Sequence, residues 1–151
     1  MCPVPPKGPD KRAGAEAGER VGAMARILVI DDEASIRNLL DTALRRQGHE
    51  VVLAGKGRTG VNLFKHTRPQ VTIVDLKLPD MGGLAVLQEI RALDPAAPVI
   101  ILTGFGTEEG VQQARELGVT EFLQKGFATG FSLQSLDSAV TRVLTRSGQA
   151  P

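Results

Sequence analysis

Five short apolar runs alternate with longer segments of helical period between residues 25 and 146, and this alternation constrains the fold more than any other feature. The runs are rich in valine, isoleucine and leucine, as strands buried on both faces of a sheet are. We predict strands at residues 26–30, 50–54, 71–74, 99–102 and 121–123. Because parallel strands need helical crossovers, the sequence predicts an α/β fold with a doubly wound, five-stranded parallel sheet.

The segments between these strands carry apolar side chains at spacings of three and four residues, which is typical of amphipathic helices. We predict helices at residues 34–47, 59–66 and 84–93, a fourth that begins at Thr107, and a fifth over 133–144. The second helix is expected to be short and weak. The glycine-rich segment 55–60 before it lacks the residue order of a phosphate-binding loop, so we interpret it as a solvated turn.

The regions outside the alternating pattern differ in composition. Residues 1–24 hold four of the nine prolines and few branched apolar side chains, so we expect a disordered N-terminal extension. One domain is expected over residues 25–146, followed by a short tail at 147–151. Met24 directly precedes this domain, and we keep as a hypothesis that translation begins there. The intact mass of natively expressed protein would test it.

Composition excludes several classes of protein. Lysine and arginine number 18 against 17 acidic residues, and the chain has neither tryptophan nor tyrosine, so we expect no direct nucleic-acid partner. No apolar run approaches the roughly 18–20 residues of a membrane span, so we expect no membrane partner. Cys2 is the only cysteine, which excludes an internal disulfide framework. These features favour a cytoplasmic location.

Acidic side chains follow two of the predicted strands. Asp31, Asp32 and Glu33 follow the first strand, and Asp75 follows the third. In open parallel sheets, ligands bind beyond the carboxyl ends of the strands. Clustered carboxylates repel one another unless a cation lies between them, and oxygen ligands without histidine or cysteine favour Mg²⁺. The alternative is that Asp31 and Asp32 only cap the first helix, an interpretation that Asp75 makes less favoured.

A hydroxyl and an ammonium group are expected at the same edge of the sheet. Thr103 follows the fourth predicted strand, and Lys125 lies two residues beyond the fifth. Taken singly, Thr103 would be a turn residue and Lys125 a solvated surface charge. With carboxylates and Mg²⁺, they are the groups needed to hold a phosphoryl group in line with a carboxylate nucleophile. His49 and His66 are separated from the acids, so we interpret both as surface histidines.

These motifs resemble the receiver domain of bacterial two-component response regulators. The resemblance covers nearly all of residues 25–144 and rests on ILVIDDE at 27–33, VDLKLPDMGGL at 74–84, ILTG at 101–104 and FLQK at 122–125. It implies a flavodoxin-like (βα)5 receiver fold with the strand order 2-1-3-4-5. Because only about seven residues follow the fifth predicted helix, we expect a stand-alone signalling module without an attached effector domain.

The resemblance also implies a role for each site residue. Asp75 would accept a phosphoryl group from a sensor histidine kinase, a histidine phosphotransfer domain or a small acyl phosphate. The Mg²⁺ ligands would be Asp32, Asp75 and the backbone carbonyl of Lys77, with Asp31 acting mostly through a metal-bound water. Thr103 and Lys125 would bind phosphoryl oxygens.

The same resemblance implies a switch. Thr103 would shift toward the new phosphoryl group, the ring of Phe122 would turn into the space it leaves, and the face formed by the fourth helix, fifth strand and fifth helix would change. A downstream effector protein would read that face. Alternatively, Phe122 is an ordinary core aromatic, since it lacks the hydroxyl that often tethers the ring in this family.

The chain departs from the family pattern in two places. Gly126 follows Lys125 where the family usually has proline, and a cis bond without proline costs about 2.5–4 kcal/mol. We therefore expect a trans bond and a differently aimed Lys125. Lys77 and Phe105 stand where the family influences the attack of water on the phospho-aspartate, and neither has a carboxamide. We expect slow self-dephosphorylation.

Two other functions stay open. A degenerate receiver that binds proteins without being phosphorylated is favoured by Gly126, but all five residues of the site are present. A phosphatase with an aspartyl nucleophile would need a second acid in a D-x-D pattern, and Lys77 stands in that position. The phosphoacceptor is the function that we predict, as a self-phosphorylating signalling module more than as an enzyme.

Overall fold

The computed structural model describes residues 25–104, 108–119, 121–124 and 133–146. The predicted N-terminal extension, the tail, Thr107, Phe105, Lys125 and Gly126 lie outside these ranges. The elements along the chain are β1 (Arg26–Ile30), α1 (Ala34–Arg46), β2 (Glu50–Ala54), α2 (Gly57–Thr67), β3 (Val71–Asp75), α3 (Gly83–Leu93), β4 (Val99–Thr103), α4 (Glu108–Glu116), β5 (Glu121–Gln124) and α5 (Leu133–Arg146).

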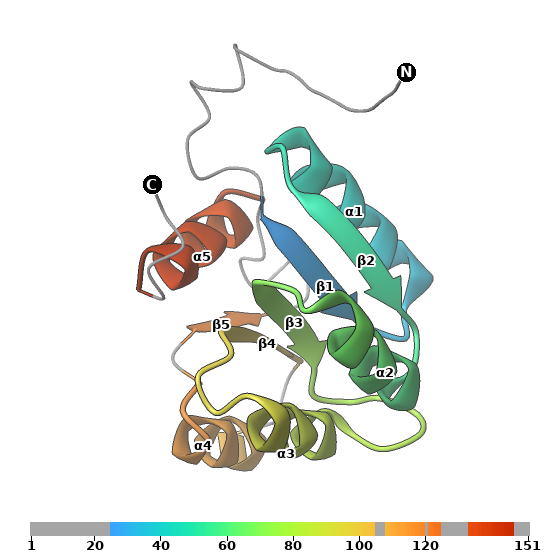
Figure 1. Ribbon diagram of the computed structural model, residues 1–151, viewed down its shortest axis with the longest axis vertical. Helices are drawn as coiled ribbons and strands as arrows, with labels where there is room; N and C mark the ends of the chain where they lie inside the picture. Colours follow the sequence, from blue (N-terminus) through green and yellow to red (C-terminus); the bar gives the residue numbers. More distant parts are fainter. Residues whose placement is uncertain (1–24, 105–107, 120, 125–132, 147–151) are drawn as a thin grey trace.

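The five strands form one parallel sheet in the order β2-β1-β3-β4-β5, with helices packed against it (Figure 1). The predicted fold class and strand order are confirmed. All five residues of β3 are buried, as expected for a strand covered on both faces. Among the described residues, no helix is long and apolar enough to cross a membrane.

Alternate side chains of the central strands divide the core into two layers, because successive side chains of a strand point to opposite faces. Ile27 and Val29 of β1 pack in a buried cluster with side chains of α1 and α5. Leu28 and Ile30 pack in the other cluster, with side chains of α2, α3 and α4. The strands β1, β3 and β4 are parallel, so their carboxyl ends lie at the same edge of the sheet. The residues that follow these three strands therefore come together there.

The second helix differs from the prediction. It begins at Gly57, two residues earlier than expected, and runs for 11 residues, as many as α3. The solvated turn predicted at 55–60 is therefore wrong from Gly57 onward: Gly57 and Gly60 are buried and helical. A Cβ at Gly60 would approach Ile30 Cδ1 to 2.4 Å, so the glycine lets α2 lie close against β1.

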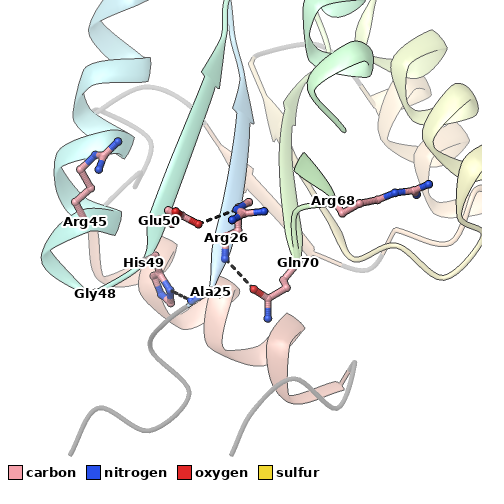
Figure 2. Close-up of a pocket in the computed structure, with 8 residues that line it drawn as sticks. All are labelled: Ala25, Arg26, Arg45, Gly48, His49, Glu50, Arg68 and Gln70. Atoms are coloured by element: carbon pink, nitrogen blue, oxygen red, sulfur yellow. Dashed lines mark hydrogen bonds and ion pairs between the residues drawn. The ribbon is translucent and has the colours of Figure 1, made fainter. Parts of the chain in front are cut away.

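The surface position predicted for His49 is wrong, whereas His66 is exposed. His49 is only 8% exposed, and its Nδ1 accepts a hydrogen bond of 3.2 Å from the backbone N–H of Ala25. It lies in a pocket at the amino-terminal edge of the sheet (Figure 2), opposite the edge that follows the ends of β1 and β3. Burial lowers the pKa of His49 below its ordinary value, and Asp137 offsets part of that effect.

This histidine predicts a pH dependence of stability. Unfolded His49 binds a proton more readily than folded His49, so its contribution to stability is complete above about pH 6.5 and is lost as the pH falls toward the lower folded pKa. Urea unfolding at pH 7.5 and 5.5 should show a larger loss in the wild type than in His49→Gln. The exposed His66 supplies the control. Between pH 7.5 and 5.5, His66→Gln should lose as much free energy of unfolding as the wild type loses. Equal losses in all three proteins would contradict the prediction.

Candidate metal and phosphoacceptor site

Three aspartates meet where β1 and β3 end. Ile30 pairs with Val74 in the parallel register, so the next residues of the two strands, Asp31 and Asp75, emerge side by side. Carboxylate oxygens of Asp31, Asp32 and Asp75 lie within 4.8 Å of one another. Asp31 and Asp75 are 0% and 3% exposed, and Asp32 is exposed. The predicted acidic cluster is thus formed by the fold.

Backbone amides orient the two buried carboxylates. The N–H of Glu33 donates to Asp31 Oδ1 at 2.8 Å, and the N–H of Lys77 donates to Asp75 Oδ1 at 3.1 Å. Each bond joins a side chain to the amide two residues later, the pattern of an Asx turn. The bond of Asp31 reaches Glu33, the residue before α1, and not an amide of the first helical turn. This bond of Asp31 is therefore an Asx turn and not a helix cap.

The donor set fits a hard divalent cation. Oxygens that share a Mg²⁺ at about 2.1 Å lie up to roughly 4.2 Å apart, and the carboxylate oxygens of this cluster lie within 4.8 Å of one another. The ligand atoms are carboxylate oxygens, without a histidine or cysteine among them, which suits Mg²⁺ better than zinc or copper. Two buried carboxylates side by side are stabilised by a cation between them. Asp31, Asp32 and Asp75 are therefore the residues that would hold the ion.

The segment after β3 is held close to the site. The N–H of Leu76 donates to the carbonyl of Leu102 at 3.2 Å, and the N–H of Gly83 donates to the carbonyl of Leu76 at 2.9 Å. The helix α3 begins at Gly83, in close contact with the backbone of Asp75. A Cβ at position 83 would lie 2.2 Å from the Asp75 carbonyl oxygen, and glycine avoids this clash. Lys77 is exposed, and its amide is fixed by Asp75.

The remaining predicted site residues are described only in part. Thr103 is the last residue of β4. The preceding residue, Leu102, pairs with Asp75 of β3, so the backbone of Thr103 reaches the same edge of the sheet as the acidic cluster. Lys125 follows the last residue of β5, which pairs with Thr103, and lies outside the described residues. The acids are therefore brought together, and the strand that carries Thr103 ends beside them.

Phe122 is partly buried against the core layer of α2, α3 and α4. The guanidinium carbon of Arg115, from α4, lies 4.7 Å from the centre of its ring, within the range of a cation–π contact. The neighbouring Glu121 accepts two hydrogen bonds of 3.0 and 2.9 Å from Arg142 of α5. Arginines from both flanking helices thus contact β5. The contact of Arg115 is not predictable from the sequence, because helical spacing alone does not show which strand residue a helix will cover.

Two further residues near the site were also missed. Arg37 of α1 donates to the backbone carbonyl of Asp31 at 2.6 Å. Asp80, in the loop after β3, accepts hydrogen bonds from the N–H groups of Gly57 and Arg58 at 2.8 and 3.0 Å. Asp80 stands in the motif at residues 74–84 and in a Pro-Asp turn pattern, but neither reveals a partner 23 residues away.

Fold and site together define an α/β domain with an acidic cation site at the carboxyl edge of a doubly wound sheet. The family model for the response regulator receiver domain matches residues 27–137. The chain therefore belongs to the receiver domain family of two-component response regulators, and its fold is the flavodoxin-like (βα)5 fold of that family.

Individual relatives agree with this assignment. Over 81% of its length the chain is 35% identical to the regulatory protein AtoC of Escherichia coli K12, of which it covers 26%. It is 29% identical to the sporulation initiation phosphotransferase F of Bacillus subtilis, covering 79% of this chain and 93% of that protein. The chain spans about a quarter of AtoC and about half of the ycf27 transcriptional regulators that it also matches.

Solved structures show the same fold. A response regulator receiver domain protein from Clostridium thermocellum is 33% identical, with a TM-score of 0.77 over 83% of this chain and 98% of that one. The chemotaxis protein CheY4 of Vibrio cholerae is 30% identical, with a TM-score of 0.73 over 80% of this chain and 99% of that one. The described residues thus form a domain of the size and shape of these receivers.

Proposed function

We propose that this domain takes a phosphoryl group from a sensor histidine kinase or a histidine phosphotransfer domain onto Asp75, with Mg²⁺, and thereby changes the face that it presents to an effector protein. The observation that carries the proposal is the cluster of Asp31, Asp32 and Asp75, with oxygens within 4.8 Å and two members buried. The match to a phosphotransferase over 93% of that protein's length supports it. A cytoplasmic location is part of the same proposal.

The chemistry is attack of an Asp75 carboxylate oxygen on phosphorus. The new O–P bond forms as the N–P bond of a phosphohistidine breaks, and the leaving imidazole takes up a proton. The hydrogen bond from Lys77 N–H to Asp75 Oδ1 orients the carboxylate before the attack. Bound Mg²⁺, with Asp31, Asp32, Asp75 and the Lys77 carbonyl as its proposed protein partners, would neutralise charge on the carboxylates and phosphoryl oxygens.

Thr103 and Lys125 are the proposed partners of the phosphoryl oxygens. The proposed switch then acts through Thr103 and Phe122, toward the face formed by α4, β5 and α5. The contact of Arg115 with the Phe122 ring places a charged side chain of that face directly on the proposed switch residue. A change in the ring's position would therefore also move an arginine that a partner protein can contact.

Acetyl phosphate tests the proposal without a cognate kinase. Incubation with acetyl phosphate and Mg²⁺ should raise the intact mass by about one phosphate, roughly 80 Da, and EDTA should prevent the increase. A phosphate gain that does not depend on Mg²⁺ would contradict the proposed site. If neither acetyl phosphate nor phosphorylated histidine phosphotransfer domains raise the mass of the protein, the result would favour a binding module that works without phosphorylation. The departure from the family pattern at Gly126 keeps that alternative open.

The phosphorylated form should decay slowly. Lys77 presents an ammonium group where a carboxamide would orient the attacking water, so a lifetime of minutes or longer is expected. The rate is measured by following the loss of the phosphate mass after acetyl phosphate is removed. Lys77→Asn should shorten the lifetime, and the exposed Lys65 of α2 provides the matched control, Lys65→Asn, which should leave it unchanged. A wild-type lifetime of seconds would contradict the prediction.

A further inference from the structure

We propose that Asp80 is a positioning residue for the metal site: by binding the first amides of α2, it holds in place the loop that would offer the Lys77 carbonyl to Mg²⁺. This inference rests on the proposed function, because it concerns the same ion. Asp80 lies three residues beyond Lys77 and outside the acidic cluster, so it would act through the loop and not by touching the ion.

The contact between Asp80 and α2 uses both carboxylate oxygens. Oδ1 accepts from the N–H of Gly57 at 2.8 Å, and Oδ2 accepts from the N–H of Arg58 at 3.0 Å. Lys56, at the N-cap position of α2, makes no side-chain cap of its own. A helix leaves its first amides without partners inside the helix and carries partial positive charge there, so a carboxylate is the group that this end prefers. These amides lower the pKa of Asp80, so the carboxylate is charged at neutral pH.

Packing supports the same attachment. A Cβ at Gly57 would lie 2.4 Å from Met81 Cγ and 2.8 Å from Val86 Cγ2, so the start of α2 is in close contact with the loop and with α3. Arg58 forms a two-bond ion pair with Glu89 of α3, at 3.0 and 2.9 Å. The first turn of α2 is therefore joined to both the loop and α3. The two helices are neighbours in the fold (Figure 1).

The segment 77–80 of this loop is consequently held at both ends. At its start, the N–H of Lys77 donates to Asp75 Oδ1, and at its far end the Asp80 carboxylate binds α2. Without Asp80, the loop would keep its bond to Asp75 and the backbone hydrogen bonds of Leu76 and Gly83, but the Lys77 carbonyl, which lies between these points, would sample more orientations. Ordering it on the ion would then cost conformational entropy that the folded wild type has already lost. Mg²⁺ affinity should fall, although no ligand atom has been removed.

The test is a calorimetric titration of the 151-residue chain with magnesium chloride alone. Asp80→Ala should raise the Kd for Mg²⁺ about 10-fold, the lower end of the range for residues that orient metal ligands, and Asp80→Asn should raise it by less. Asp94→Ala is the matched control. Asp94 also accepts a hydrogen bond from a loop amide, that of Ala96 at 3.0 Å, but it precedes β4 and so lies at the opposite edge of the sheet. Its Kd should stay within about twofold of the wild type.

Amide chemical shifts separate positioning from a general loss of stability. In the wild type, Mg²⁺ should shift the amide signals of Gly57 and Arg58, and in Asp80→Asn these shifts should shrink while signals of the acidic cluster still respond. A wild-type Kd in folded Asp80→Ala or Asp80→Asn would overturn the inference and leave the proposed function intact. An equal rise in Asp94→Ala would also overturn it. A wild type that does not bind Mg²⁺ would overturn the proposed site itself, and this inference with it.

Discussion

Asp75→Asn should abolish the gain of about 80 Da that acetyl phosphate and Mg²⁺ are expected to produce in the wild type. The carboxamide has nearly the same size as the carboxylate, but it is neutral and a poor nucleophile, so the O–P bond cannot form at a useful rate. The substitution also removes one of the three clustered carboxylates, which should weaken Mg²⁺ binding. Intact-mass measurement after a fixed incubation reads out the effect directly.

The control for this substitution is Asp94→Asn, which makes the same chemical change at the opposite edge of the sheet. It should take up phosphate at the wild-type rate. Circular dichroism of both variants should match the wild type, which separates loss of the nucleophile from loss of the fold. Phosphate uptake by folded Asp75→Asn at the wild-type rate would mean that another residue is the acceptor.

Gly83→Ala should be strongly destabilising. The new Cβ would lie 2.2 Å from the carbonyl oxygen of Asp75 and 2.6 Å from the Cα of Leu76, and both are backbone atoms that cannot rotate away. The start of α3 would have to move away from β3. Overpacking of this kind costs about 1–3 kcal/mol and more where backbone must shift, so we expect the free energy of unfolding to fall by about 3 kcal/mol. Urea denaturation measures the change.

Gly104→Ala provides the comparison, because in the part of the chain that the structure describes no atom beyond the chain neighbours of Gly104 lies within 4 Å of a Cβ built there. Its free energy of unfolding should stay within about 1 kcal/mol of the wild type. Gly83→Ala should also weaken Mg²⁺ binding, since the displaced backbone belongs to Asp75 itself. Wild-type stability of Gly83→Ala would show that α3 does not begin against Asp75 as described.

The fold could be predicted from sequence because its signals are local. Five apolar runs separated by helical segments define parallel strands, and the rule that ligands bind beyond strand ends indicated where acids would meet. The cluster of Asp31, Asp32 and Asp75 is confirmed by the geometry on this basis. The predicted roles of all the site residues, Asp75, Thr103 and Lys125 included, stay predictions.

The errors arose where a distant residue determines local structure. The start of α2 was placed two residues late because its cap is Asp80, 23 residues beyond Gly57. The glycines of that segment indicated a turn, whereas they allow α2 to pack against Met81 and Ile30. The surface prediction for His49 fails because nothing near it in sequence shows that the backbone N–H of Ala25 will be its partner. Local patterns do not contain these long-range contacts.

The most direct test of the central claim identifies the residue that carries the phosphoryl group. Acyl phosphates are reduced by borohydride, so treating the Mg²⁺-dependent phosphorylated protein with borohydride should convert the modified aspartate to homoserine. Mass spectrometry of peptides locates that change. We expect homoserine at position 75 and unmodified aspartate at positions 31, 32 and 80. Homoserine at any of those three positions, or phosphate retained on His49 or His66, would contradict the account.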